Sequence, residues 1–363
     1  MAKRVSVDKT LFTATLLLVF SGLVMVFSAS AVMAAERFGS PYHFLFRQMA
    51  WATAGLAAMV ALMHVDYRRL RHPAVVFSLL GLTTLLLVAV FFLDRTANTH
   101  RWIRLGAFSF QPSELAKPAL ILYLAWFLET RLRALDDWRN TLLPATVPIL
   151  LFAALIVKQP DLGTAIVVVL IAAVLLFLAG LRLRYFGIAA AASLVPLYFL
   201  VFRVKWRYER ILAFLDPYSD PLGRGFHVIQ SLIAVGAGGV FGTGLMEGKQ
   251  KLFYLPEPHT DFIFAVAAEE TGLVGALILL ALITVFLYRG IRCANAASEP
   301  FARLLAAGIT AMVAVQAFLN ISVVLGLMPT KGIPLPLVSY GGSSLFVTLA
   351  SIGVLLNITQ HTD

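Results

Sequence analysis

Long apolar stretches recur along the chain, separated by short polar segments that carry most of the charge. About 20 helical residues cross the hydrocarbon core of a bilayer, and each stretch reaches or approaches that length. The pattern therefore predicts an all-α polytopic membrane protein of about ten transmembrane helices. The predicted spans are residues 10–34, 44–64, 74–93, 112–129, 141–157, 162–180, 186–203, 261–288, 302–326 and 337–357.

The composition agrees with a bilayer environment. Of 363 residues, 60% are hydrophobic and 13% are charged, whereas soluble globular domains carry about 25% charged residues. No polar stretch suggests a separate soluble domain, so we expect one integral-membrane domain over residues 1–363. The lone cysteine, Cys293, excludes an intramolecular disulfide and a cysteine-based metal cage.

The distribution of basic residues predicts the orientation. With a cytoplasmic N-terminus, every inner loop is basic, as the positive-inside rule expects. An even number of spans then returns the C-terminus to the cytoplasm. The residues concerned are Arg68, Arg69, Arg71, Arg131, Arg133, Arg139, Arg182, Arg184, Arg289, Arg292 and Arg303.

Two outer segments are also basic, against this trend. One runs from Arg95 to Lys117 and the other from Arg203 to Lys251. Positive charge on the translocated side opposes insertion, so an anionic ligand at the outer leaflet is a natural explanation. The alternative is that a long loop translocates regardless of its charge, which covers only the second segment.

The second segment belongs to an outer loop of about 57 residues, 204–260, which exceeds ordinary connection lengths and is expected to be structured. Residues 226–244 within it are moderately apolar and rich in glycine. This pattern fits an interfacial or re-entrant segment, and the glycines could alternatively form an amide nest for a phosphate.

Ionisable residues near span ends are functional candidates because charge is costly inside a bilayer. Glu114 and Lys117 are three residues apart at the start of the fourth span, so they share a helical face and can pair. This pair has two readings, a structural ion pair or a lysine fixed for a phosphate. Asp161, between two short spans, is expected to cap the following helix.

Asp261 lies where the long outer loop enters an apolar helix. A helix N-terminus favours the ionised carboxylate and partial desolvation opposes it, a setting suited to a general base. A plain N-cap is the competing interpretation. Glu269 and Glu270, two helical turns further on, are expected to join helices or form ion pairs rather than to act as reagents.

The segment from Pro329 to Ser344 contains three prolines, Lys331 and several hydroxyl groups between the last two spans. Non-helical backbone at membrane depth is tolerated where it lines a cavity, so this segment is expected to wall the site.

These motifs together resemble the SEDS family (shape, elongation, division and sporulation). The resemblance covers essentially all ten spans, and Pro329-Thr-Lys331-Gly is similar to the FtsW-like and sporulation branches rather than to the RodA branch. It rests on His100-Arg-Trp102-Ile-Arg104-Leu-Gly, Phe110-Gln-Pro-Ser-Glu114-Leu-Ala-Lys117, Gln159-Pro-Asp161-Leu-Gly-Thr164, Leu255-Pro-Glu-Pro-His259-Thr-Asp261-Phe-Ile-Phe-Ala and Pro334-Leu-Pro336-Leu-Val-Ser339-Tyr340-Gly-Gly-Ser-Ser.

The resemblance implies an inverting peptidoglycan glycosyltransferase that polymerises lipid II at the outer face of the bacterial cytoplasmic membrane, for septal or elongation cell-wall synthesis. It implies Asp261 as the catalytic residue, and as partners a class B penicillin-binding protein and other division or elongation proteins, with no nucleic acid. A lipid II flippase and a non-catalytic scaffold for the penicillin-binding protein are the alternatives.

The chemistry of a pyrophosphate leaving group needs one base and several cations, because the leaving group departs as a stabilised anion. Trp102 and Tyr340 could stack on sugar or anchor at the interface. A divalent cation could share the diphosphate charge, and no residue spacing assigns one. The candidates for the pyrophosphate are Arg104, Glu114, Lys117, Lys205, Arg207, Arg210 and Lys331, with Trp102, His259, Ser339 and Tyr340 in support.

Overall fold

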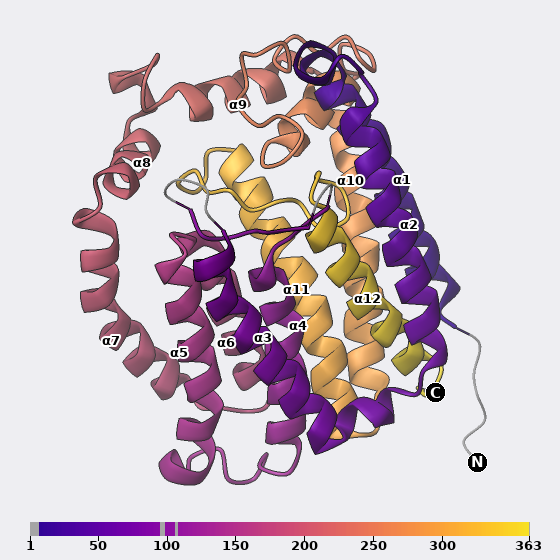
Figure 1. Ribbon diagram of the computed structural model, residues 1–363, viewed down its shortest axis with the longest axis vertical. Helices are drawn as coiled ribbons and strands as arrows, with labels where there is room; N and C mark the ends of the chain where they lie inside the picture. Colours follow the sequence, from indigo (N-terminus) through magenta and orange to yellow (C-terminus); the bar gives the residue numbers. More distant parts are fainter. Residues whose placement is uncertain (1–6, 95–98, 106–107, 363) are drawn as a thin grey trace.

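A computed structural model describes residues 7–94, 99–105 and 108–362. Each of the ten predicted spans corresponds to a helix, so the all-α prediction is confirmed (Figure 1). The ten helices are α1 (Lys9–Phe38), α2 (His43–His64), α3 (Pro73–Leu93), α4 (Pro112–Glu129), α5 (Leu143–Lys158), α6 (Leu162–Leu178), α7 (Leu183–Phe202), α10 (Ile263–Ala296), α11 (Pro300–Val324) and α12 (Gly342–Thr359).

Within the described residues, eight helices are long and apolar enough to cross a membrane. The other two predicted spans are α4, which carries Glu114 and Lys117, and α6, which has 17 residues. The molecule is therefore a multi-pass membrane protein, and ten remains the predicted number of crossings.

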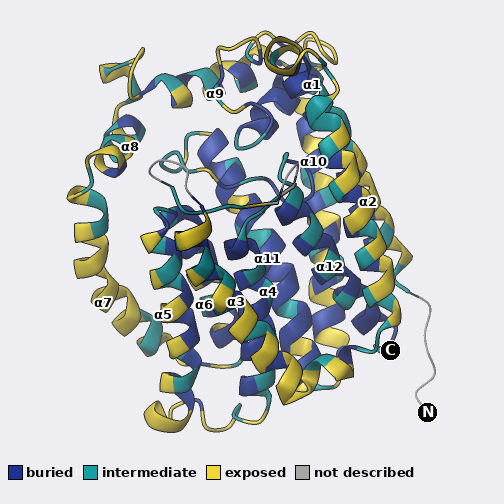
Figure 2. Ribbon diagram, viewed as in Figure 1, coloured by how far each residue is buried: buried dark blue, intermediate teal, exposed yellow. Residues whose placement is uncertain are grey.

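The helix α11 lies at the centre of the bundle and is largely buried, whereas α7 stands at the edge and has no buried residue (Figure 2). A helix that is apolar on all sides suits either place, since lipid and protein core are equally apolar surroundings. The two chain ends meet at one end of the bundle, where Asp8 forms an ion pair with Arg289 and its N–H donates to Thr359 Oγ1 over 3.3 Å.

A small antiparallel hairpin, β1 (Ile103–Leu105) and β2 (Phe108–Phe110), precedes α4. It is the one departure from all-α structure among the described residues, and the apolar pattern did not predict it. Short strands leave too brief an alternation of side chains to be recognised. Arg95, the first residue of the predicted basic outer segment, lies outside the described residues.

The predicted loop 204–260 is structured. It contains α8 (Lys205–Leu215), a short 3-10 turn and α9 (Phe226–Ala237), and it crosses one end of the bundle (Figure 1). The apolar, glycine-rich stretch predicted as interfacial or re-entrant thus begins as a helix and ends in turns around Gly239, Gly242 and Gly244, all of which have positive φ.

The helix α10 is broken at Gly272, whose φ of 66° and ψ of −166° interrupt the helical backbone. A Cβ at this position would lie 2.3 Å from the Gly242 nitrogen, so only glycine allows the loop to approach this closely. The break separates a half-helix, residues 263–271, from the longer part, residues 273–296. The predicted span 261–288 therefore contains two elements, and its helix continues beyond residue 288.

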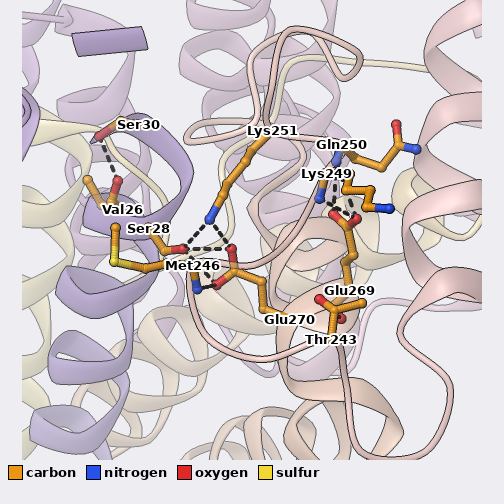
Figure 3. A network of polar contacts seen from close by, with 10 residues as sticks. All are labelled: Val26, Ser28, Ser30, Thr243, Met246, Lys249, Gln250, Lys251, Glu269 and Glu270. Carbon is orange, nitrogen blue, oxygen red and sulfur yellow. Dashed lines mark hydrogen bonds and ion pairs between the residues drawn. The ribbon is translucent and has the colours of Figure 1, made fainter. Parts of the chain in front are cut away.

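The predicted role of Glu269 and Glu270 in joining elements is confirmed (Figure 3). Lys251 Nζ donates to Glu270 Oε1 over 2.6 Å and to Ser28 Oγ of α1 over 3.0 Å. The Glu269 carboxylate accepts from the N–H groups of Lys249 and Gln250. These contacts hold the loop, α1 and the end of the half-helix together.

Candidate functional site

Asp261 lies directly before the half-helix, at the junction of three cavities. Their volumes are about 410, 330 and 470 Å³, and Asp261 and Gly332 line all three. The α10 N-cap is Phe262 and no side chain caps this helix, so the interpretation of Asp261 as a plain N-cap is wrong. The carboxylate is instead turned toward the cavities.

The surroundings of Asp261 favour the neutral, protonated form of its carboxyl group more than water does. Burial raises the pKa of the Asp261 carboxyl to about 7, and the negative charge of Glu257 adds to the shift while Arg210 opposes it. A carboxyl group with this pKa is partly ionised near neutrality and can accept a proton from a hydroxyl. Its pKa therefore suits a general base.

The 410 Å³ cavity is lined by cations. Burial lowers the pKa of the Arg210 guanidinium, and burial together with the positive charge of Arg210 lowers the pKa of the Lys331 ammonium to about 8. No described carboxylate lies within ion-pair distance of these cations, so an anion would relieve their mutual repulsion. The cations that line this cavity are Arg101, Arg207, Arg210 and Lys331.

Backbone contacts fix several of these cations. Arg101 Nε donates to the Gln159 carbonyl over 3.0 Å, and its guanidinium also contacts the Pro160 carbonyl. Arg207 Nη1 donates to the Leu200 carbonyl over 2.9 Å. Both Arg207 and Arg210 lie 5.0 Å from the ring centroid of Trp206, a cation–π distance. Such fixed cations bind a ligand with little loss of side-chain entropy.

The same cavity has an apolar side. Leu197 and Val201 of α7 and Ile166 of α6 also line it. Because α7 stands at the edge of the bundle and has no buried residue, these residues adjoin the lipid-facing surface. A molecule with an anionic head and a hydrocarbon tail matches both sides of the cavity.

The other two cavities are more polar in their lining residues. The 330 Å³ cavity extends from Asp261 toward Glu209, Arg224 and His227. The 470 Å³ cavity extends in another direction and includes, among the predicted residues, Trp102, Glu114 and Tyr340. Rings and hydroxyl groups of this kind bind sugars through stacking and hydrogen bonds.

The predicted pairing of Glu114 with Lys117 is confirmed. Lys117 Nζ lies 2.7 Å from Glu114 Oε2 and 2.5 Å from Gln316 Oε1, and its side chain is buried. Glu114 reaches the 470 Å³ cavity, whereas Lys117 lines none of the three. Asp161 caps α6 as expected, through Oδ1 and the Thr164 N–H, and also lines two of the cavities.

Other predicted residues support the site from behind or lie apart from it. The His259 ring packs against Phe44 and Tyr340, with centroid distances of 4.6 and 5.5 Å. Ser339 is buried beside it. Arg104 and Lys205 are exposed and line none of the three cavities. The structure thus brings together part of the predicted cation set around Asp261.

Sequence reasoning missed several residues that the structure places at the site. Arg101 was one of several basic residues in the predicted outer segments, and nothing in the sequence distinguished it from the others. Gly332 lies so close to Asp261 that a Cβ there would be 2.9 Å from Oδ2. Asn320 is a polar residue on the mainly apolar helix α11. Polar residues inside a span are functional candidates, so the sequence did contain a signal for this one.

Metal ligands do not cluster in the part of the chain that the structure describes, where no group of three or more His, Cys, Asp or Glu residues could hold an ion. The described positive charges that line the 410 Å³ cavity with Asp261 belong to arginine and lysine side chains.

Fold and site together define a multi-pass membrane protein in which the Asp261 carboxylate faces a cation-lined cavity bordered by α7. The family model for cell cycle proteins of the FtsW, RodA and SpoVE type matches residues 8–363, and the chain belongs to this family.

Individual relatives cover nearly the whole chain. A probable peptidoglycan glycosyltransferase FtsW from Geobacter sulfurreducens is 47% identical over 94% of this chain and 91% of its own. Stage V sporulation protein E from Bacillus subtilis is 43% identical over 99% of both chains.

Two solved structures are similar over nearly their full length. A chain from a structure described as a peptidoglycan synthase complex that coordinates polymerization and crosslinking has a TM-score of 0.79 and 37% identity, with 98% of each chain covered. The rod shape determining protein RodA from Thermus thermophilus has a TM-score of 0.71 and 32% identity, with 98% of this chain and 97% of that chain covered.

Proposed function

We propose that this protein is a peptidoglycan glycosyltransferase that polymerises lipid II into glycan strands, with Asp261 as the general base. One observation carries the proposal: a carboxyl group with a pKa of about 7 faces a cavity whose cations form no ion pair among the described residues and whose lining also includes apolar residues of α6 and α7. The names of the relatives support the reaction class.

The reaction is a single displacement at a sugar C1. The acceptor hydroxyl oxygen forms a bond to C1 while the bond from C1 to the pyrophosphate oxygen breaks, and the hydroxyl proton passes to Asp261. Attack opposite the leaving group inverts the configuration at C1. The leaving pyrophosphate gains negative charge, which Arg207, Arg210 and Lys331 would stabilise in a water-poor cavity.

The two ends of the donor match the two sides of the 410 Å³ cavity. The pyrophosphate would lie against the cations, and the prenyl chain would leave along Leu197 and Val201 toward the lipid. The sugars would occupy the more polar cavities. Lys117 would act indirectly, because it is buried, lines none of the three cavities and holds Glu114 at the 470 Å³ cavity.

We further propose that the site faces the extracytoplasmic side. The basic loops lie with both chain ends at one end of the bundle, and the loop 204–260, which ends directly before Asp261, crosses the other (Figure 1). By the positive-inside rule the basic end is cytoplasmic. Lipid II exposed on the outer leaflet would then reach the cavity from the membrane.

A class B penicillin-binding protein is the expected partner, because the synthase complex among the similar structures joins polymerization to crosslinking. The higher identity to FtsW and stage V sporulation protein E than to RodA, together with Lys331, supports a division-like or sporulation-like role over an elongation role.

The test is purified protein incubated with lipid II, with and without Asp261→Asn, and read on a glycan gel. We expect polymer from the wild type and none from the variant. Equal polymer from both would exclude Asp261 as the base. Folded wild-type protein that makes no polymer, even with its partner present, would instead favour the flippase or the scaffold, which a lipid II translocation assay in vesicles then separates.

A further inference from the structure

Asn320 of α11 joins the residue that carries the catalytic carboxylate to the segment that carries Lys331. Its side chain is only 2% exposed. The Nδ2 group donates one hydrogen to the Asp261 carbonyl over 2.8 Å and the other to the Ile333 carbonyl over 2.7 Å. Two carbonyl acceptors at these distances require the amide nitrogen, so the orientation of the side chain is defined.

Further hydrogen bonds join the same two segments. Ser339 Oγ donates to the Thr260 carbonyl over 2.6 Å, and the Tyr340 N–H donates to the His259 carbonyl over 2.9 Å. Residues 259–261 are thus hydrogen-bonded to residues 333–340. Of the side chains that form these links, only Asn320 belongs to a third element, the buried helix α11. That helix provides a rigid base against which both segments are held.

The Asp261 side chain itself needs such support from the backbone. It caps no helix, and no described donor forms a hydrogen bond with its carboxylate. Gly332 is its neighbour on one side, where a Cβ would lie 2.9 Å from Oδ2. The position of the carboxylate in the cavity therefore depends on where the backbone carbonyls of Asp261 and Ile333 are held.

We propose that Asn320 is a positioning residue that sets the distance between the Asp261 carboxylate and the wall formed by Lys331 and Gly332. This inference rests on the proposed role of Asp261 as the base. The competing role is purely structural, since any buried amide that satisfies two carbonyls contributes to folding. The two roles differ in what a substitution does to the folded enzyme.

Asn357 of α12 offers a matched control. It is also buried and also bridges backbone groups, accepting from the Tyr67 N–H over 2.9 Å and donating to the Met63 carbonyl over 2.8 Å. It lines none of the three cavities. Asn357→Leu should therefore lower stability without changing catalysis by the folded fraction.

The experiment compares Asn320→Leu, Asn320→Asp and Asn357→Leu, purified and checked for folding, in the lipid II polymerisation assay. For the two Asn320 variants we expect kcat to fall about 100-fold, the loss that a misplacement of about 1 Å causes. KM for lipid II should change less than about threefold. In Asn320→Asp, burial and the two carbonyl oxygens should hold the new carboxyl group protonated, so that it can donate only one of the two hydrogen bonds.

Two outcomes overturn the proposal. One is a kcat within threefold of the wild type in both folded Asn320 variants, and the other is a loss no larger than that of Asn357→Leu. If Asn320→Leu does not fold, the isosteric Asn320→Asp decides. Asp261→Asn is run in parallel. If it is inactive while the Asn320 variants resemble the Asn357→Leu control, the positioning role of Asn320 is excluded and Asp261 remains the base. If it is active, Asp261 is not the base.

Discussion

The protonation state of Asp261 and Lys331 should control the rate. Asp261, whose pKa is about 7, can accept a proton only when ionised, so kcat/KM should rise as the pH passes 7. Lys331, whose pKa is about 8, binds an anion only when protonated, so kcat/KM should fall above pH 8. We predict a narrow bell-shaped profile, measured by initial rates of polymerisation with the folded fraction checked at each pH.

The alkaline limb has its own control. Lys331→Arg keeps the positive charge at all pH values used, so it should remove the fall above pH 8 and leave the acidic limb in place. An acidic limb near pH 4, the ordinary value for a carboxyl group, would contradict the effect of burial on Asp261.

Gly332 permits the contact between its segment and Asp261. A Cβ at residue 332 would lie 2.9 Å from Asp261 Oδ2, closer than such atoms approach, so Gly332→Ala should displace the carboxylate. We predict a loss of about 10- to 100-fold in kcat with folding retained. Gly81→Ala on α3, where the new Cβ meets no atom within 4 Å, is the matched control and should keep full activity. Equal activity of the two variants would contradict the prediction.

For single residues, the sequence indicated which side chains carry functional charge but not which segments approach one another in the fold. Asp261 and Lys331 could be predicted because charge at a membrane boundary is costly and therefore selected for a purpose. Gly332 and Asn320 could not be assigned, because their importance comes from contacts between segments far apart in the chain. Arg104 and Lys205 show the converse, since an outer position does not determine which way a side chain points.

Among the elements, the loop segment 243–251 and the half-helix of α10 depend on a buried ion pair. Lys251 and Glu270 have side chains 3% and 0% exposed and lie 2.6 Å apart. Lys251→Met leaves the Glu270 carboxylate buried without a cation, which should lower the free energy of unfolding by about 3–5 kcal/mol. Thermal unfolding of the purified protein in one detergent measures the change.

Two companions make this prediction specific. The double variant Lys251→Met with Glu270→Gln removes both charges and should recover most of the lost stability. Arg182→Met breaks the exposed ion pair with Asp136, 2.9 Å in length, and should cost no more than about 1 kcal/mol. A Lys251→Met variant as stable as Arg182→Met would show that the buried pair does not hold the loop.

The positions of the spans were predictable because a 20-residue apolar run has few alternatives in a membrane protein. The break in α10 was not, since an isolated glycine is tolerated in a helix and Gly272 becomes a break only through contact with Gly242. The helices α8 and α9 inside loop 204–260 were likewise not predicted individually, because their apolar residues pack partly against the bundle and partly face outward.

Taken as a whole, the molecule should expose the loop 204–260 outside the cell and the basic loops inside. Its one cysteine, Cys293, is buried, so a Cys293→Ala background accepts single reporter cysteines. We predict that Ser219→Cys reacts with a membrane-impermeant maleimide in cells whose outer envelope has been permeabilised and whose cytoplasmic membrane is intact. Ala134→Cys, between α4 and α5, should react only after the cytoplasmic membrane is permeabilised. The reverse labelling pattern would contradict the proposed orientation.

The distribution of charge predicted an anion site on one side of the molecule, and among the described residues the cations that line the cavity at Asp261 form no ion pair. The shape of that site could not be predicted, because it arises where α6, α7, α8 and the segment 329–341 meet. Side-chain directions across such a junction depend on helix rotation and tilt, which a hydropathy pattern does not specify.

The junction of three cavities at one carboxylate also matters for inhibition. Each cavity, at about 410, 330 and 470 Å³, falls in the size range of small-molecule sites. A compound with one arm in each of two cavities would gain from the high effective concentration of its second arm. Resistance would be costly to the bacterium, because a substitution that expels the linking group at Asp261 or Gly332 would also damage polymerisation.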